Sequence, residues 1–128
     1  MVVGGATAAL AGACGTWLQT GAESRNSFAL VTTARSLGVV TGSAASFVAT
    51  WYLLPCLVGC IWLAAGAERD RLAAVAGILT AALAGIGALV AFRSPFATGF
   101  GPQITAVGAG ITVLGIALTF LDTSWRKV

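Results

Sequence analysis

Four long apolar runs divide the chain, separated by polar or loop-forming segments. None of the runs contains Asp, Glu, Lys or Arg, and they cover about residues 2–18, 44–65, 72–92 and 104–121. A helix that crosses a bilayer needs about 20 mostly apolar residues, within a range of about 17–25. The pattern therefore predicts four transmembrane helices, the first of them short, in a single all-α integral membrane domain of 128 residues.

The three connections between these runs differ in length and composition. Residues 66–71 read GAERDR, a tight charged turn, whereas residues 93–102 read RSPFATGFGP, a loop marked by Pro and Gly. The first connection is much longer and contains residues 27–37, which favour a short helix. Asn26 or Ser27 can cap its start, and Gly38 can end it in a left-handed conformation.

One face of this short helix is apolar. Leu30, Ala34 and Leu37 recur at helical spacing, while Arg35 and the threonines lie elsewhere. A weakly amphipathic helix of this kind suits the boundary between lipid headgroups and acyl chains. We therefore expect an interfacial helix in the first connection, after a turn at residues 20–25.

Composition supports a membrane protein. Hydrophobic residues make up 58% of the chain and charged residues 9%, with a mean hydropathy of +0.94. A soluble domain carries about 25% charged residues, so this chain has too few to cover a water-exposed surface. The net charge of +3 is spread along the chain. It therefore lacks the basic stripe of a nucleic-acid-binding protein.

The Lys and Arg residues set an expected orientation. The side that holds both termini and the 66–71 turn carries four of them, Arg69, Arg71, Arg126 and Lys127. The opposite side carries three, Arg25, Arg35 and Arg93. Cytoplasmic loops carry the excess of positive residues. This favours a bacterial plasma-membrane protein with both termini in the cytoplasm.

Candidate chemistry is sparse. The chain has no histidine, which removes the commonest general base and metal ligand. No ionisable residue lies inside an apolar run, where transporters and pumps usually keep one. Cys14, Cys56 and Cys60 lie in apolar runs and are interpreted as small core residues rather than a metal site. Cys14 also follows a sequence faintly like a lipoprotein cleavage box, but we expect a retained first helix. The sequence thus predicts no enzyme activity, cofactor or metal.

Small residues recur on three of the four predicted spans and are candidate packing positions, because close approach of small residues drives helix association in lipid. They are Gly77, Ala81 and Gly85 in the third span, Gly108, Thr112 and Gly115 in the fourth, and Gly4, Ala8 and Gly12 in the first. Packing within the bundle is the simpler interpretation. A partner helix or a second copy of the chain is the alternative.

Arg25, Phe28, Arg35 and Arg93 are the candidate contacts with a partner protein or with lipid headgroups. The three arginines fall on one side of the predicted membrane, and arginine pairs well with phosphate and carboxylate. They can equally anchor helix ends, with Arg25 paired to Glu23. Trp51 and Tyr52 are expected to pack in the outer third of the second span, against the first.

The chain as a whole resembles small four-helix membrane proteins of high-GC actinobacteria, many without an assigned function. The resemblance rests on the Ala/Gly-rich spans, the Trp at the end of the first span followed by TGAESRNSF, Pro55, and GFGP before the fourth span. It implies no substrate. We expect a non-catalytic accessory or scaffolding subunit of a membrane complex. The alternative is a small carrier or channel for an apolar or lipid-like solute.

Overall fold

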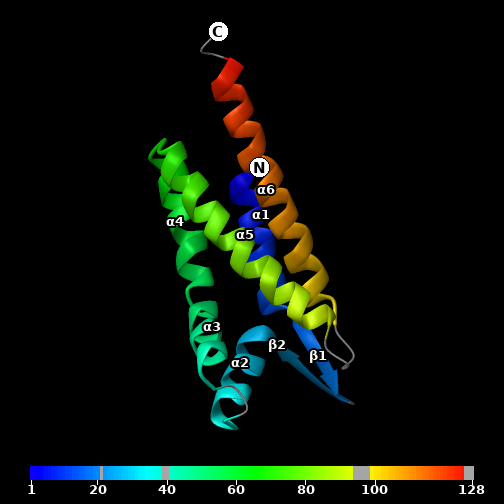
Figure 1. Ribbon diagram of the computed structural model, residues 1–128. Helices are drawn as coiled ribbons and strands as arrows, with labels where there is room; N and C mark the ends of the chain where they lie inside the picture. The colour runs from blue at the N-terminus through cyan, green and yellow to red at the C-terminus, as the bar shows by residue number, and fades with distance from the viewer. Residues whose placement is uncertain (21, 39–40, 94–98, 126–128) are drawn as a thin grey trace.

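The computed structural model describes residues 1–20, 22–38, 41–93 and 99–125. Helices α1, α4, α5 and α6 form an elongated bundle, and α3 continues the line of α4 towards the end that holds a two-stranded sheet and α2 (Figure 1). The elements in chain order are α1 (Val2–Cys14), β1 (Thr16–Thr20), β2 (Glu23–Asn26), α2 (Ser27–Ser36), α3 (Ser43–Trp51), α4 (Leu54–Gly66), α5 (Asp70–Phe92) and α6 (Gly101–Trp125).

Within the described residues, three helical segments are long and apolar enough to cross a membrane: Val48–Gly66, Asp70–Phe92 and Gly101–Asp122. They contain the third and fourth predicted spans and most of the second. Helix α1 has 13 residues, which gives a length of about 20 Å against a hydrocarbon core of about 30 Å. The described residues therefore contain three helical segments of membrane-spanning length, the first of them made of the end of α3 and all of α4, and α1 is a shorter apolar helix beside them.

The first predicted span was too long at its C-terminal end. Helix α1 stops at Cys14, Gly15 is extended, and Thr16 begins β1 instead of continuing the helix. Strands β1 and β2 pair antiparallel, with an irregularity near Trp17. The all-α expectation therefore missed a hairpin where we expected only a turn. Aromatic and β-branched residues such as Thr16 and Trp17 fit a strand well, but their position after an apolar run hid this.

The second predicted span is divided. Helix α3 ends at Trp51 and α4 begins at Leu54, with a turn between them. Pro55 lies in the first turn of α4. Proline has no backbone N–H, and its ring clashes with the carbonyl four residues earlier, here that of Trp51. The break before Pro55 relieves both problems.

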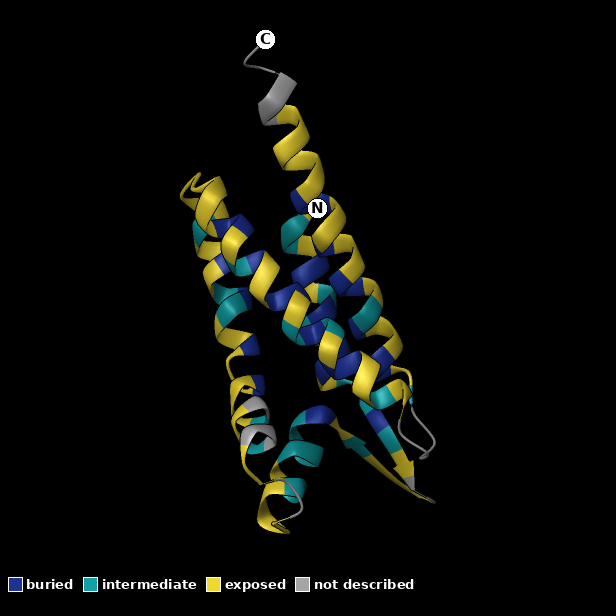
Figure 2. Ribbon diagram, viewed as in Figure 1, coloured by how far each residue is buried: buried dark blue, intermediate teal, exposed yellow. Residues whose placement is uncertain are grey.

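Much of α4, α5 and α6 is exposed, and buried residues gather where the helices face one another (Figure 2). The buried positions of α1 are all small: Gly5, Ala6, Ala9, Gly12 and Ala13. Large apolar side chains instead point outward from α4, α5 and α6, and include Leu63, Val90, Val107 and Phe120. A soluble monomer rarely exposes so much contiguous apolar surface. In lipid the arrangement is favourable, because small residues allow close helix contact and large ones face the acyl chains.

The two ends of the bundle carry different segments (Figure 1). The N-terminus, the α4–α5 turn and the C-terminal end of α6 lie at one end. The hairpin, α2 and the C-terminal end of α5 lie at the other. The predicted grouping of segments is therefore the one found, although Arg126 and Lys127, which contribute to the predicted orientation, lie outside the described residues.

Candidate functional site

Two side chains from the first connection close the C-terminal end of α1. The last four carbonyls of a helix lack partners within it, and a bilayer interior offers no water to replace them. The Trp17 Nε1–H donates to the Gly12 carbonyl oxygen at 2.9 Å, and the Ser27 hydroxyl donates to the Ala13 carbonyl oxygen at 2.6 Å. The Gly12 carbonyl oxygen also accepts from the Gly15 N–H at 3.0 Å. The Ser27 hydroxyl is therefore the more important partner, because it satisfies the Ala13 carbonyl where the helix stops.

A second tryptophan completes this buried network. The Trp51 Nε1–H donates to the Ser27 Oγ at 3.0 Å, and the Trp51 ring meets Trp17 edge to face with centroids 5.4 Å apart. Ser27 is 2% exposed and Trp51 3% exposed. One hydroxyl thus joins α3 to the end of α1. Buried and fully paired polar networks of this kind fix a single arrangement, because each unpaired member would cost free energy.

Two glycines let the indole rings lie directly on helix backbones. A Cβ atom at Gly87 of α5 would overlap the Trp51 ring, and one at Gly101 of α6 would overlap Trp17. Trp17 therefore joins the first connection to α6, and Trp51 joins α3 to α5. Trp51 meets Trp17 and Ser27 of the first connection, so its expected packing against the first helix stays a prediction. Trp17, expected to mark a helix end, belongs to a strand.

Helix α2 has the predicted terminal signals. The Asn26 side chain accepts a hydrogen bond from the Ala29 N–H at 2.8 Å, which is an N-cap. Gly38, at the other end, has φ of +65°, the left-handed conformation that glycine adopts most readily. The helix occupies residues 27–36 of the predicted 27–37. Its existence is confirmed, and its position at a membrane interface stays a prediction.

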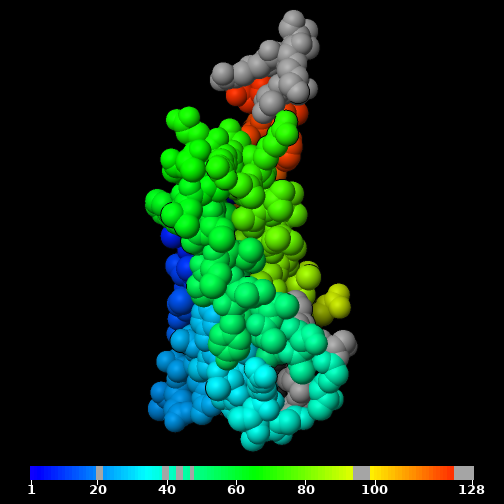
Figure 3. Space-filling model, turned by 90° about the vertical axis from the view of Figure 1, so that its left-hand side faces the viewer, coloured from blue at the N-terminus to red at the C-terminus, as the bar shows by residue number. Residues whose placement is uncertain are grey.

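Aromatic and hydroxyl contacts bind α2 to the turn between α3 and α4. The Thr32 and Tyr52 hydroxyls share a hydrogen bond of 2.7 Å, and the Phe28 ring lies 6.0 Å from the Tyr52 ring. We call β1, β2 and α2 the hairpin–helix unit (residues 16–36, of which residue 21 is not described). In Figure 3 its blue and cyan atoms form one end of the molecule.

The four predicted contact residues have different surroundings. Arg25 pairs with the Glu23 carboxylate at 3.2 Å and donates to the Thr33 hydroxyl at 3.2 Å, so its expected pairing within the chain is confirmed. Phe28 is half-buried against the core. Arg35 and Arg93 are exposed at the ends of α2 and α5. Within the described ranges, no ion pair or hydrogen bond joins the three arginines into one site.

Three predicted packing residues of α6 lie against α1. A Cβ atom at Gly108 would lie 2.8 Å from the Ala9 Cα, and one at Gly115 would lie 2.8 Å from the Val2 nitrogen. Thr112 is fully buried, and its hydroxyl donates to the Gly108 carbonyl oxygen at 2.8 Å. Helix α1 makes its most extensive contact with α6, and small residues on both helices make that approach possible.

Only some of the predicted packing residues of α5 make contacts within the bundle. Gly77 packs against Ile116 and Val2, and Ala81 is buried. A Cβ atom at Gly85 would meet no described residue within 4 Å, so this glycine makes no close packing contact with the described part of the bundle.

The face of α1 that packs differs from the one expected. Gly4 has open space around it, and Ala8 is only half-buried. Gly5 and Ala9 face α6 instead, and with Gly12 they complete the small stripe that meets Thr105 and Gly108. Small residues occupy positions 4, 8 and 12 and also positions 5, 9 and 12. Spacing within one helix therefore does not show which of these two faces packs against a neighbour. The partner helix selects the face.

The three cysteines correct another expectation. Cys14, Cys56 and Cys60 are all exposed on helix surfaces rather than buried in the core. A thiol is apolar enough to face acyl chains, so burial against protein is not required. No group of three or more metal-ligating side chains occurs in the part of the chain that the structure describes.

Comparisons with protein-family models, with curated proteins and with solved structures give no match to this chain.

Proposed function

We propose that the protein is a non-catalytic accessory or scaffolding subunit of a larger membrane complex. In this proposal it lies in the bacterial plasma membrane, with both termini in the cytoplasm and the hairpin–helix unit on the outer side. The observation that carries the proposal is that the long first connection is a folded unit, fixed to the bundle by the buried bonds of Trp17, Ser27 and Trp51.

A folded connection of this length is more than two helices need. Joining neighbouring helices usually takes about 2–8 residues. Ordering each further residue costs about 1–2 kcal/mol of backbone entropy. Long connections with structure of their own are typical of binding loops held by a rigid scaffold. The buried network supplies that rigidity here, so the unit can present a fixed surface to a partner.

The outer surface of the unit suits a polar protein contact. Its exposed side chains mix hydroxyl, amide, acidic and basic groups: Gln19, Glu23, Ser24, Asn26, Thr32, Arg35 and Ser36. Arginine is among the residues that contribute most at protein interfaces. In this proposal Arg35, which has no ion pair within the described residues, contacts an acidic or carbonyl group of the partner.

The membrane-facing surface offers room for a partner helix. Gly59, Gly85 and Gly110 each face open space, one on each of α4, α5 and α6. Glycines on an exposed transmembrane surface permit close approach of another helix backbone. A partner with its own membrane span could therefore contact the bundle and the hairpin–helix unit together.

The proposal can be tested by site-specific crosslinking in the native membrane. A photo-reactive amino acid at position 19 or 35 should yield one discrete adduct with a single partner protein. The same amino acid at position 68, at the opposite end of the molecule, is the matched control and should not give that adduct. Introducing Ser27→Ala should weaken the adduct, because the unit loses its anchor. Only lipid adducts at positions 19 and 35 would argue against a subunit role.

The carrier hypothesis has one observation in its favour, an apolar groove of about 500 Å³ between α4 and α5. The groove spans about ten residues of each helix, which is about 15 Å or half of the hydrocarbon core. A path for a solute must cross the whole core. Solute flux into liposomes that contain only this protein would favour the carrier over the subunit.

A further inference from the structure

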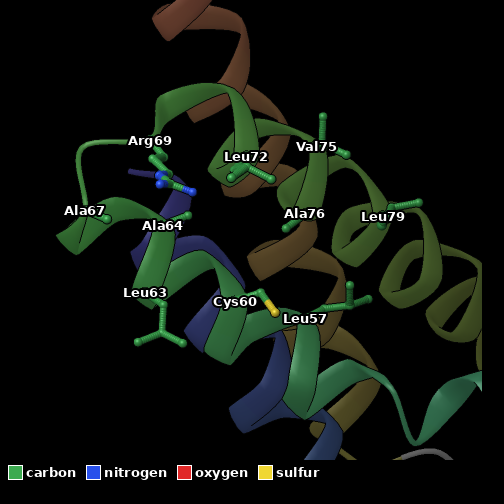
Figure 4. A pocket seen from close by; sticks show the side chains of 10 residues that line it. All are labelled: Leu57, Cys60, Leu63, Ala64, Ala67, Arg69, Leu72, Val75, Ala76 and Leu79. Carbon is green, nitrogen blue, oxygen red and sulfur yellow. The ribbon is translucent and has the colours of Figure 1, made fainter.

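The groove between α4 and α5 is apolar along its length and ends in a cation (Figure 4). Figure 4 shows the Cys60 sulfur directed into the groove and the Arg69 guanidinium lying between the two helices, near Ala64. Cys60 and Ala64 of α4 line one side of the groove, and Arg69, Leu72, Val75 and Leu79 line the other. The cation thus lies at the end of the bundle that carries the α4–α5 turn.

Arg69 is held in place by its own backbone. Its N–H donates to the Ala64 carbonyl oxygen at 2.9 Å, and the N–H of Glu68 donates to the Ala65 carbonyl oxygen at 3.2 Å. These two bonds form a Schellman motif, with Glu68 as the left-handed residue at φ of 55°. The Arg69 carbonyl oxygen also accepts from the Ala73 N–H at 3.1 Å and so begins α5. The backbone of Arg69 is therefore fixed beside the C-terminal end of α4, and its side chain lines the groove there.

The neighbouring carboxylates do not line the groove. Asp70 lines a separate hollow on the α1 and α6 side of α5, and Glu68 lines neither hollow. Among the described residues, Arg69 has no ion pair or side-chain hydrogen bond. The groove therefore presents an unpaired guanidinium above an apolar surface, with no acidic group in its lining.

We propose that this groove binds one anionic phospholipid, with the phosphate at Arg69 and an acyl chain along Leu72, Val75 and Leu79. Guanidinium groups match phosphate oxygens in shape and charge, and the apolar lining continues from Arg69 towards the middle of the bilayer. The length of about 15 Å corresponds to one leaflet, as expected for a lipid rather than a spanning partner helix. The site lies at the opposite end from the hairpin–helix unit and does not depend on the proposed subunit role.

Cys60 provides a reporter inside the groove. In a variant in which Cys14 and Cys56 are replaced by serine, a fluorophore on Cys60 is exposed to bound acyl chains. The protein is placed in phosphatidylcholine vesicles that contain 10 mol% of brominated phosphatidylglycerol, and in matched vesicles in which the brominated lipid is phosphatidylcholine. Bromine quenches only at short range. We expect stronger quenching by the brominated anionic lipid.

Arg69→Gln should reduce the preference for the anionic lipid by about fivefold, the effect of about one arginine at an anionic surface. Arg71→Gln is the matched control, because it removes the same charge from the same turn but does not line the groove. Equal quenching by both lipids in the unmodified protein would overturn the proposal. An equal loss in both variants would also overturn it, because it would indicate general surface attraction. Absence of quenching by either lipid would overturn the proposal as well, because no acyl chain would then reach the groove.

Discussion

The contact between α1 and α6 predicts opposite effects for two identical substitutions on one helix. Gly108→Ala adds a methyl group that would lie 2.8 Å from the Ala9 Cα and 2.8 Å from the Gly5 carbonyl oxygen. Gly110→Ala, two residues along α6, adds the same group where nothing lies within 4 Å. Both substitutions gain the same intrinsic helix propensity, up to about 1 kcal/mol.

The size of the effect follows from the distances. Ordinary contact begins near 3.4 Å, so the backbones beside Gly108 must separate by about 0.6 Å or more. A gap of about 0.5–1 Å removes a quarter to a half of the dispersion attraction between facing atoms. Overpacking of this kind costs about 1–3 kcal/mol. We therefore expect Gly108→Ala to destabilise the bundle, and Gly110→Ala to leave it unchanged or slightly more stable.

Thermal unfolding of the purified protein in a mild detergent, followed by circular dichroism, measures this difference. In a domain of this size, 1 kcal/mol shifts Tm by about 3–6 °C, which is readily resolved. Each variant is compared with the unmodified protein in the same detergent. Equal Tm values for the two variants, or a higher Tm for Gly108→Ala, would refute close α1–α6 packing as a source of stability.

Three further predictions concern other features. Ser27→Ala leaves the Trp51 N–H and the Ala13 carbonyl unpaired and should lower the free energy of unfolding by about 2–5 kcal/mol. In a Trp51→Phe background the same substitution should lower it by less. An equal loss in both backgrounds would exclude the hydrogen bond between Trp51 and Ser27. Glu68→Gly should raise stability by about 0.5–1 kcal/mol, because glycine relieves the left-handed strain at some entropic cost; lower stability in chemical denaturation would contradict that account. In a variant without native cysteines, single cysteines at positions 24 and 68 should react with an impermeant maleimide from opposite sides of the membrane, with position 24 outside. Labelling of both from one side would exclude the arrangement of the two ends.

Much of the helical part of the fold is readable in the sequence because membrane-length apolar runs have few alternative structures. The third and fourth predicted spans lie within α5 and α6, and Asn26 and Gly38 gave correct signals for the ends of α2. These signals are local: a run of apolar residues, a capping side chain, a glycine that tolerates positive φ. Each needs no knowledge of the rest of the molecule.

The errors arise where distant residues decide the structure. Helix α1 can end at Cys14 because the Ser27 hydroxyl donates to the Ala13 carbonyl oxygen. Ser27 lies 13 residues beyond the end of the helix and is itself held by a hydrogen bond from Trp51. No local pattern distinguishes Ser27 from a solvent-exposed serine. Likewise, Gly5 is a packing residue and Gly4 is not, because α6 lies against the face of α1 that carries Gly5. The Schellman motif at Glu68 could not be predicted from the sequence, because glutamate stands where glycine is the usual residue.

The contact of α1 with α6 also has a consequence for how the protein is made. Their partner surfaces are separated by about 90 residues of chain, which a ribosome adds in about 5–20 s. Throughout that interval α1 has no α6 to receive its glycine face. The bundle can therefore close only after α6 has emerged. We therefore expect premature termination within α6 to leave the glycine face of α1 without its packing partner.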